Sequence, residues 1–200
     1  MQGEPTDMRI SAKRAIALPV AALSAVALSG VVATTASADT VSGSVSLTVN
    51  ASFLAQLAAH GIGFVPQHYT SLSYAAGAAT VTFAETSGNA EISTYSGTES
   101  YSGGILGFDV RTGQLVDLDT LIFDLGGTTF YGESSTSGGE TPLLDLAGAQ
   151  NGYQDGTSET YSATSLTLDQ AGAAYLDSAL HTTAFAAGTV VGSFTAAWTD

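Results

Sequence analysis

The sequence predicts a mainly β protein: an antiparallel β-sandwich or barrel-like domain with two short helices, one near each end of the mature chain. Three observations support this class. Residues 45–49 and 80–83 alternate apolar with hydroxyl side chains, the period of a half-buried strand. Short apolar runs recur between Gly- and Ser-rich turns, as expected for sandwiches and barrels. Two segments, at opposite ends of the mature chain, switch to helical spacing.

The strands are expected where apolar runs lie between these turns. Their ranges are 45–49, 80–83, 105–110, 116–125, 128–132, 160–168 and 189–198. The turns are Ser87-Gly88-Asn89, Thr112-Gly113, Gly126-Gly127, Ser137-Gly138-Gly139 and Asn151-Gly152. No linker divides them, so residues 39–200 are expected to form a single domain.

The two helical segments are similar in sequence. A strand at 46–50 leads directly into a helix at 50–60, and a strand at 165–169 into a helix at 169–181. Asn50 and Asp169 are the expected N-caps. The apolar stripes should be buried against a sheet; they contain Leu54, Leu57, Leu176 and Leu180. The similarity fits either an old duplication of one strand-helix unit or two similar units that arose separately at equivalent ends of the sheet.

The N-terminus has the pattern of a secretory signal peptide. Basic residues between Met8 and Arg14 precede an apolar stretch at 15–32, and Ala36-Ser37-Ala38 is a typical cleavage site. We expect residues 1–38 to be removed, with Met8 as the true start. The mature chain is then expected to be secreted, with no stable membrane span, and any retention at the cell surface would need a noncovalent partner.

Charge narrows the range of partners. The full chain has a net charge of −14, and cleavage removes three of its four basic residues, leaving only Arg111. Such an anionic protein repels nucleic acid and anionic lipid headgroups. The remaining partner classes are cations, basic envelope proteins and neutral ligands such as glycans. The chain has no cysteine, so neither a disulfide nor a thiol nucleophile is available.

An acidic hairpin is the clearest candidate for a metal site. A three-residue loop at Arg111-Thr112-Gly113 would pair Asp109 with Leu115 and place Asp109, Asp117 and Asp119 on one face. Carboxylates are suitable Ca²⁺ ligands. The alternative is an ordinary solvated strand face, because the sequence has no calcium-binding loop motif.

Tyrosines in polar stretches are the candidate binding residues. They are Tyr95, Tyr101, Tyr131 and Tyr153, with Tyr161 nearby. Exposed tyrosines among small hydroxyl residues suit recognition of glycans or proteins, although tyrosines at sheet edges have the same pattern. His60 and His181 are expected to interact with the C-terminal ends of the two helices.

The sequence has no motif for catalysis. It lacks G-x-S-x-G and H-E-x-x-H, so nucleophilic and zinc hydrolysis have no support. We therefore expect no enzymatic activity; a hydrolase using two of the carboxylates is the weaker alternative.

Three segments resemble the HtaA domain, the haem-transport-associated β-rich surface domain, as found in small exported actinobacterial proteins. Residues 49–56 (VNASFLAQ) are similar to its opening K-x-S-F-R-x-Y stretch, and residues 97–104 to its G-x-V-x-F-x-G-H segment. The helix after residues 166–168, with the Ala187-Gly188-Thr189 turn, resembles its closing helix, turn and strand.

This resemblance implies a β-rich surface domain with haem as ligand. At the positions of the family's ligating tyrosine, its arginine and its histidine, this sequence has Gln56, Leu54 and Gly104. Haem needs a proximal ligand such as Tyr or His. The expected function is thus extracellular or cell-envelope binding without a cofactor, and binding of haem or a metal ion such as Ca²⁺ is the alternative.

Overall fold

The computed structural model describes residues 43–134 and 139–199. The expected signal peptide and its cleavage site lie outside the described residues. The helices are α1 (Ala51–His60) and α2 (Gln170–Leu180). The strands are β1 (Ser44–Val49), β2 (Ile62–Pro66), β3 (Thr70–Ala75), β4 (Ala78–Gly88), β5 (Thr98–Ser102), β6 (Ile105–Asp109), β7 (Leu115–Leu118), β8 (Leu121–Asp124), β9 (Thr129–Glu133), β10 (Glu140–Asp155), β11 (Ser158–Leu168) and β12 (Val190–Thr199).

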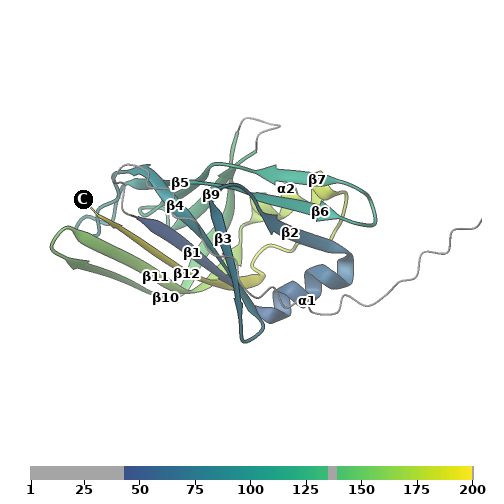
Figure 1. Ribbon diagram of the computed structural model, residues 1–200, viewed down its shortest axis with the longest axis horizontal. Coiled ribbons are helices and arrows are strands. Elements are labelled where there is room, and N and C mark those ends of the chain that lie inside the picture. Colours follow the sequence, from purple (N-terminus) through teal and green to yellow (C-terminus); the bar gives the residue numbers. More distant parts are fainter. Residues whose placement is uncertain (1–42, 135–138, 200) are drawn as a thin grey trace, which may run out of the picture. The chain divides into compact units, whose positions relative to one another are not determined.

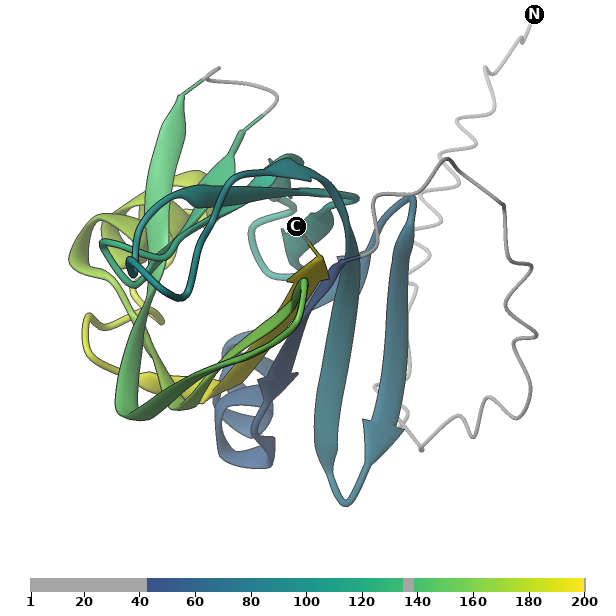
Figure 2. The ribbon, with the colours of Figure 1, turned by 90° about the vertical axis from the view of Figure 1, so that its left-hand side faces the viewer.

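Eight antiparallel strands form a closed, barrel-like sheet in the order β1-β12-β11-β10-β9-β8-β5-β4, and β4 returns to pair with β1. Figure 2 shows these strands following one another around a ring. Strand β3 is added on the outer side of β4, and β2, β6 and β7 form a second, three-stranded sheet. The predicted fold class, mainly β and barrel-like with two short helices, is confirmed.

The sheet closes into a barrel because β4 is long enough to pair with β1 and with β5. Its first half lies between β1 and β3, and its second half leaves β3 and pairs with β5. Val45 faces Phe83 on one side and Ala196 on the other, and all three side chains are fully buried. The alternation predicted for residues 45–49 and 80–83 therefore directs every second side chain into the interior.

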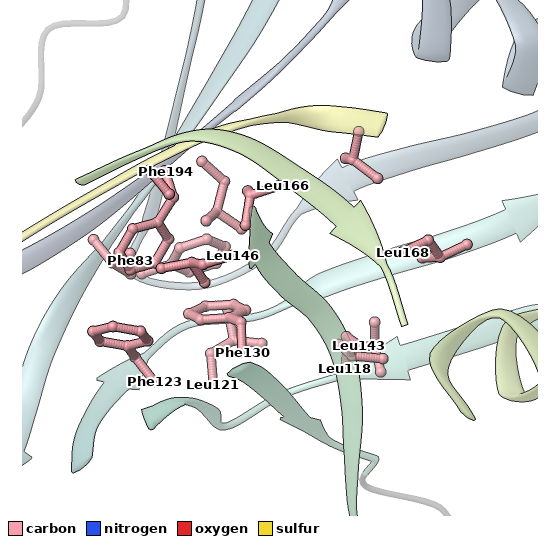
Figure 3. Packing of buried hydrophobic residues seen from close by; sticks show 14 of the residues in the cluster. Phe83, Leu118, Leu121, Phe123, Phe130, Leu143, Leu146, Leu166, Leu168 and Phe194 are labelled. Atoms are coloured by element: carbon pink, nitrogen blue, oxygen red, sulfur yellow. The ribbon is translucent and has the colours of Figure 1, made fainter. Parts of the chain in front are cut away.

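Aromatic and leucine side chains fill this interior (Figure 3). Phe123 and Phe194 lie with ring centroids 4.7 Å apart, and Phe130 packs against Phe194 at 6.2 Å. Offset and edge contacts of this kind are the favoured aromatic geometries. With no disulfide available, the fold depends on burial of these rings and of the aliphatic side chains around them.

One end of the barrel is closed by the loop at 89–97. Glu99 Oε1 accepts the N–H of Ala90 at 2.8 Å, and Glu159 Oε2 accepts the N–H of Ile92 at 2.8 Å. The indole of Trp198 donates to the carbonyl of Ala90 at 2.9 Å. Both glutamates are 1% exposed. These carboxylates satisfy loop backbone groups that would otherwise be buried without partners.

The helices and the second sheet lie at the other end (Figure 1). Both predicted helices are confirmed, and Asn50 and Asp169 cap them by accepting backbone N–H groups of the first turn. Leu57 is buried, and so are Leu176 and Leu180. Leu54 is only half-buried, contrary to expectation, because it lines a cleft described below.

Most expected strands are present with small changes of boundary. The segment 116–125 was wrong as a single strand, because the chain breaks at 119–120 into β7 and β8, which belong to different sheets. Four strands were not expected from the sequence. They are β2, β3, β5 and β10, the last being the longest of the described strands.

Candidate functional site

The acidic hairpin has a different register from the expected one. Leu115 pairs with Phe108, one residue away from the predicted partner Asp109. Asp109 instead closes a four-residue loop with Gln114, and its side chain accepts the N–H of Arg111 at 2.7 Å. Gly113, the last residue of the expected loop, lies in the left-handed region with φ of 73°.

This shift separates Asp109 from Asp117 and Asp119. Asp109 is 3% exposed and shares the inward face of β6 and β7 with Val116, while Asp117 points to the opposite face. Within residues 43–134 and 139–199 no group of three or more His, Cys, Asp or Glu side chains is arranged to hold a metal ion. The predicted common face of Asp109, Asp117 and Asp119 is therefore wrong.

Arg111 has a structural role. Its Nη2 donates to the carbonyl of Ala59 at 2.6 Å, in the last turn of α1. A guanidinium there neutralises the negative end of the helix dipole. His60 ends α1, and His181 forms the left-handed C-cap of α2, so both histidines lie where the sequence placed them.

The predicted tyrosines do not form one surface. Tyr95 and Tyr153 are exposed, at 54% and 60%, whereas Tyr131 is half-buried on β9. Tyr101 was expected to be accessible but is 1% exposed inside the barrel. Burial, together with the charges of Glu99 and Glu85, raises the pKa of Tyr101.

Tyr161 is also buried, at 3%, and edge-on to Tyr95 at 6.2 Å. The most exposed tyrosines were not among the predicted residues. They are Tyr69 and Tyr74, at 81% and 72%. Tyr74 lies in β3, where the alternation of polar and apolar residues at 71–74 is a signal that could have marked a strand. Tyr69 lies in the β2–β3 turn, which has no such pattern.

An apolar cleft of about 150 Å³ lies between α1, the barrel wall and β2. Leu54 and Leu57 line it from α1, and Phe64 lines it from β2. None of the lining residues is charged, and Tyr74 has the only polar side-chain group among them. The exposed lining residues Val65 and Tyr74 mark its opening. Such a site favours an apolar molecule and rejects ions.

A second, polar hollow of about 270 Å³ lies where β2, β5 and β7 end. Its lining residues are Gln67, His68, Tyr69, Tyr101, Ser102, Gly103, Gly104, Asp119 and Thr120. Partial burial raises the pKa of Asp119, and so do the neighbouring carboxylates Asp117 and Glu133. The charge of His68 lowers this pKa, but by less.

The raised pKa of Asp119 predicts a pH-dependent effect of Asp119→Asn. An acid whose pKa is higher in the folded state stabilises the fold only while it is protonated, and it loses that contribution as the pH rises above its ordinary value of 3.8. At pH 7 the substitution should therefore raise Tm by about 1–2 °C, because a partly exposed charge contributes roughly 0.2–1 kcal/mol. Thermal unfolding from pH 3 to 8 measures this.

The control is Asp155→Asn, at the exposed β10–β11 turn, which removes the same charge without Asp117 nearby. The interpretation fails if both variants gain equally, or if the gain of Asp119→Asn persists well below pH 3.8.

No helix in the described part of the chain is long and apolar enough to cross a bilayer. No protein-family model and no curated protein sequence matches the chain. Solved structures do match. The C-terminal domain of HtaA from Corynebacterium glutamicum superposes with a TM-score of 0.53 at 18% identity, over 80% of this chain and 97% of that one.

A domain-swapped dimer of a histidine-to-alanine variant of the same domain gives a TM-score of 0.47 at 16% identity, over 74% of this chain and 90% of that one. The closed sheet with its two flanking helices is thus an HtaA-like fold.

Proposed function

We propose that this chain is an exported, non-enzymatic binding domain that takes the apolar part of a neutral small molecule into the cleft beneath α1. The observation that carries the proposal is the lining of that cleft, which is uncharged and apolar except for Tyr74. The strongly anionic chain would repel acidic ligands, which adds to the preference for a neutral one.

The size of the cleft limits the ligand. An engineered apolar cavity of roughly 150 Å³ in another protein stays dry and binds benzene. A cleft of similar volume here accommodates one aromatic ring or a short run of methylenes. Sites for drug-sized molecules are larger, about 300–1,000 Å³. We therefore expect either a small ligand or the apolar end of a longer one.

The test uses the neutral dye N-phenyl-1-naphthylamine, whose phenyl end matches the one-ring volume of the cleft and whose emission rises in apolar surroundings. Leu54→Gln places an amide in the cleft wall, and desolvating this group should weaken dye binding about tenfold or more. Ala58→Gln puts the same amide on the exposed side of α1 and should leave binding unchanged. Absence of dye binding, or equal affinity of the two variants, would contradict the proposal.

Haem is a second candidate, favoured by one observation: Tyr74 presents a phenol at the opening of the apolar cleft. The positions that the resemblance assigns to the family's ligand residues offer none here. Gln56 donates to the carbonyl of Ala184 at 3.2 Å, Leu54 is apolar, and Gly104 lies in the polar hollow. Of a haem, the apolar cleft of about 150 Å³ could take only an edge of the ring, and Tyr74 would be the residue that holds the iron.

Titration of the protein with haemin distinguishes the two candidate ligands, a neutral apolar molecule and haem. A stoichiometric Soret shift that is lost in Tyr74→Phe and kept in Tyr153→Phe would favour haem. Our first candidate predicts no such shift, because the cleft is small and no lining residue is cationic to pair with the propionates.

A further inference from the structure

The polar hollow differs from the apolar cleft in every respect that governs ligand choice. Its lining combines a carboxylate, an imidazole, an amide, hydroxyls and two tyrosine rings. It shares no lining residue with the cleft, although Gln67 follows Pro66, and Gly104 precedes Ile105, in the chain. The two sites are therefore adjacent but chemically separate.

The loop that carries Gln67, His68 and Tyr69 is held rigidly against Gly103 and Gly104. Gln67 N–H donates to the carbonyl of Gly104 at 2.9 Å, and Gly104 N–H donates to Thr70 Oγ1 at 3.2 Å. A Cβ on Gly103 would lie 2.7 Å from the carbonyl of His68, so only glycine permits this approach. The backbone of the loop is thus held in place before any ligand arrives.

Tyr69 combines a rare backbone conformation with a solvent-exposed side chain. Its φ is 62°, in the left-handed region that bulky residues rarely adopt, and its ring is 81% exposed. Backbone strain of this kind is concentrated at binding and active sites. The ring centroid lies 6.5 Å from that of His68. Tyr69 therefore presents a flat apolar surface beside an imidazole.

The carboxylates are also held in place. Gln67 Nε2 donates to Asp117 Oδ1 at 2.8 Å, which fixes Asp117 beside Asp119. Asp119 lines the hollow and can accept hydrogen bonds, while His68 can donate or accept. Ligand hydroxyls, which both donate and accept, match this mixed set better than a group that only donates or only accepts.

We propose that this hollow binds a neutral saccharide, with the Tyr69 ring against the apolar face of one sugar and with Asp119 and His68 bonded to its hydroxyls. Anionic ligands are disfavoured by Asp119 in the lining, by Asp117 beside it and by the net charge of −14. The described residues offer no metal-holding group that would make the site a cation site. This proposal does not depend on the ligand of the apolar cleft.

The experiment is titration of the protein with neutral trisaccharides of glucose, galactose, mannose and arabinose, followed by saturation-transfer NMR. At least one should bind with a dissociation constant on the order of 1 mM or below. Tyr69→Gly should weaken that binding about tenfold or more while keeping or raising Tm, because glycine accepts a φ of 62° without strain. Asp119→Ala should also weaken binding.

The matched control is Ala76→Gly. Ala76 has φ of 51° in the β3–β4 turn, so the substitution relieves the same kind of strain away from the hollow and should leave saccharide binding intact. The proposal is overturned if none of the four sugars binds, or if Tyr69→Gly and Asp119→Ala bind as tightly as the parent. N-phenyl-1-naphthylamine should bind Tyr69→Gly as tightly as the parent protein. A loss of saccharide binding alone would then be assigned to the polar hollow and not to the apolar cleft.

Discussion

Leu57→Ala and Leu176→Ala should each lower the free energy of unfolding by about 2–5 kcal/mol, the range for large-to-small changes in a core. Leu57 is 3% exposed and Leu176 5% exposed, one on each helix. Helices shorter than about 12–15 residues are marginal alone in water, so α1 and α2 depend on these contacts with the sheets. Urea denaturation followed by circular dichroism measures the change.

Leu115→Ala is the control for both, since it makes the same chemical change at a side chain that is 63% exposed on β7. It should move the free energy of unfolding by no more than about 0.5 kcal/mol. If either helix variant were as stable as Leu115→Ala, the helices would not be held by their apolar stripes.

Gly192→Ala should destabilise the protein by about 3 kcal/mol or more, lowering Tm by roughly 6–12 °C. Gly192 pairs with Val49 where β12 meets β1, and a Cβ there would lie 1.8 Å from the carbonyl oxygen of Thr48. That atom belongs to the backbone, so relief requires the two strands to separate. Thermal unfolding gives the comparison.

Gly139→Ala is the matched substitution, because a Cβ at Gly139 has no atom within 4 Å. Its Tm should stay close to that of the parent protein. Similar Tm values for Gly192→Ala and Gly139→Ala would show that β1 and β12 are not as close at this point as described.

The parts of the fold that could be predicted are those where a local pattern decides the structure. Residues 45–49 alternate because one face is buried, and Asn50 and Asp169 precede helices because their side chains accept first-turn N–H groups. Strand β10 was missed because its second half, from the left-handed Gly148 onward, is polar and largely exposed in a long hairpin with β11.

The acidic hairpin shows why the candidate site was harder to predict. Segregating charged from apolar residues favoured a register with Asp109 facing outward. The structure buries Asp109 instead, because its carboxylate accepts the backbone N–H of Arg111, a turn donor that would otherwise lack a partner. Tyr101 was misjudged for a related reason: its Ser-rich neighbours suggested an exposed segment, but alternate residues of β5 point into the barrel. The burial of Tyr101 depends on tertiary contacts, whereas the bond of Asp109 is a local turn contact that a division into charged and apolar faces does not take into account.

Because Trp198 is hydrogen-bonded to Ala90, tryptophan fluorescence can monitor the loop at 89–97. Trp198 is the only tryptophan in the chain, and its indole is 2% exposed while it donates to the Ala90 carbonyl. Intrinsic fluorescence excited at the tryptophan band therefore reports the state of this one end of the barrel. An emission shift that precedes the loss of β-sheet circular dichroism would identify opening of the loop as a separate step in unfolding.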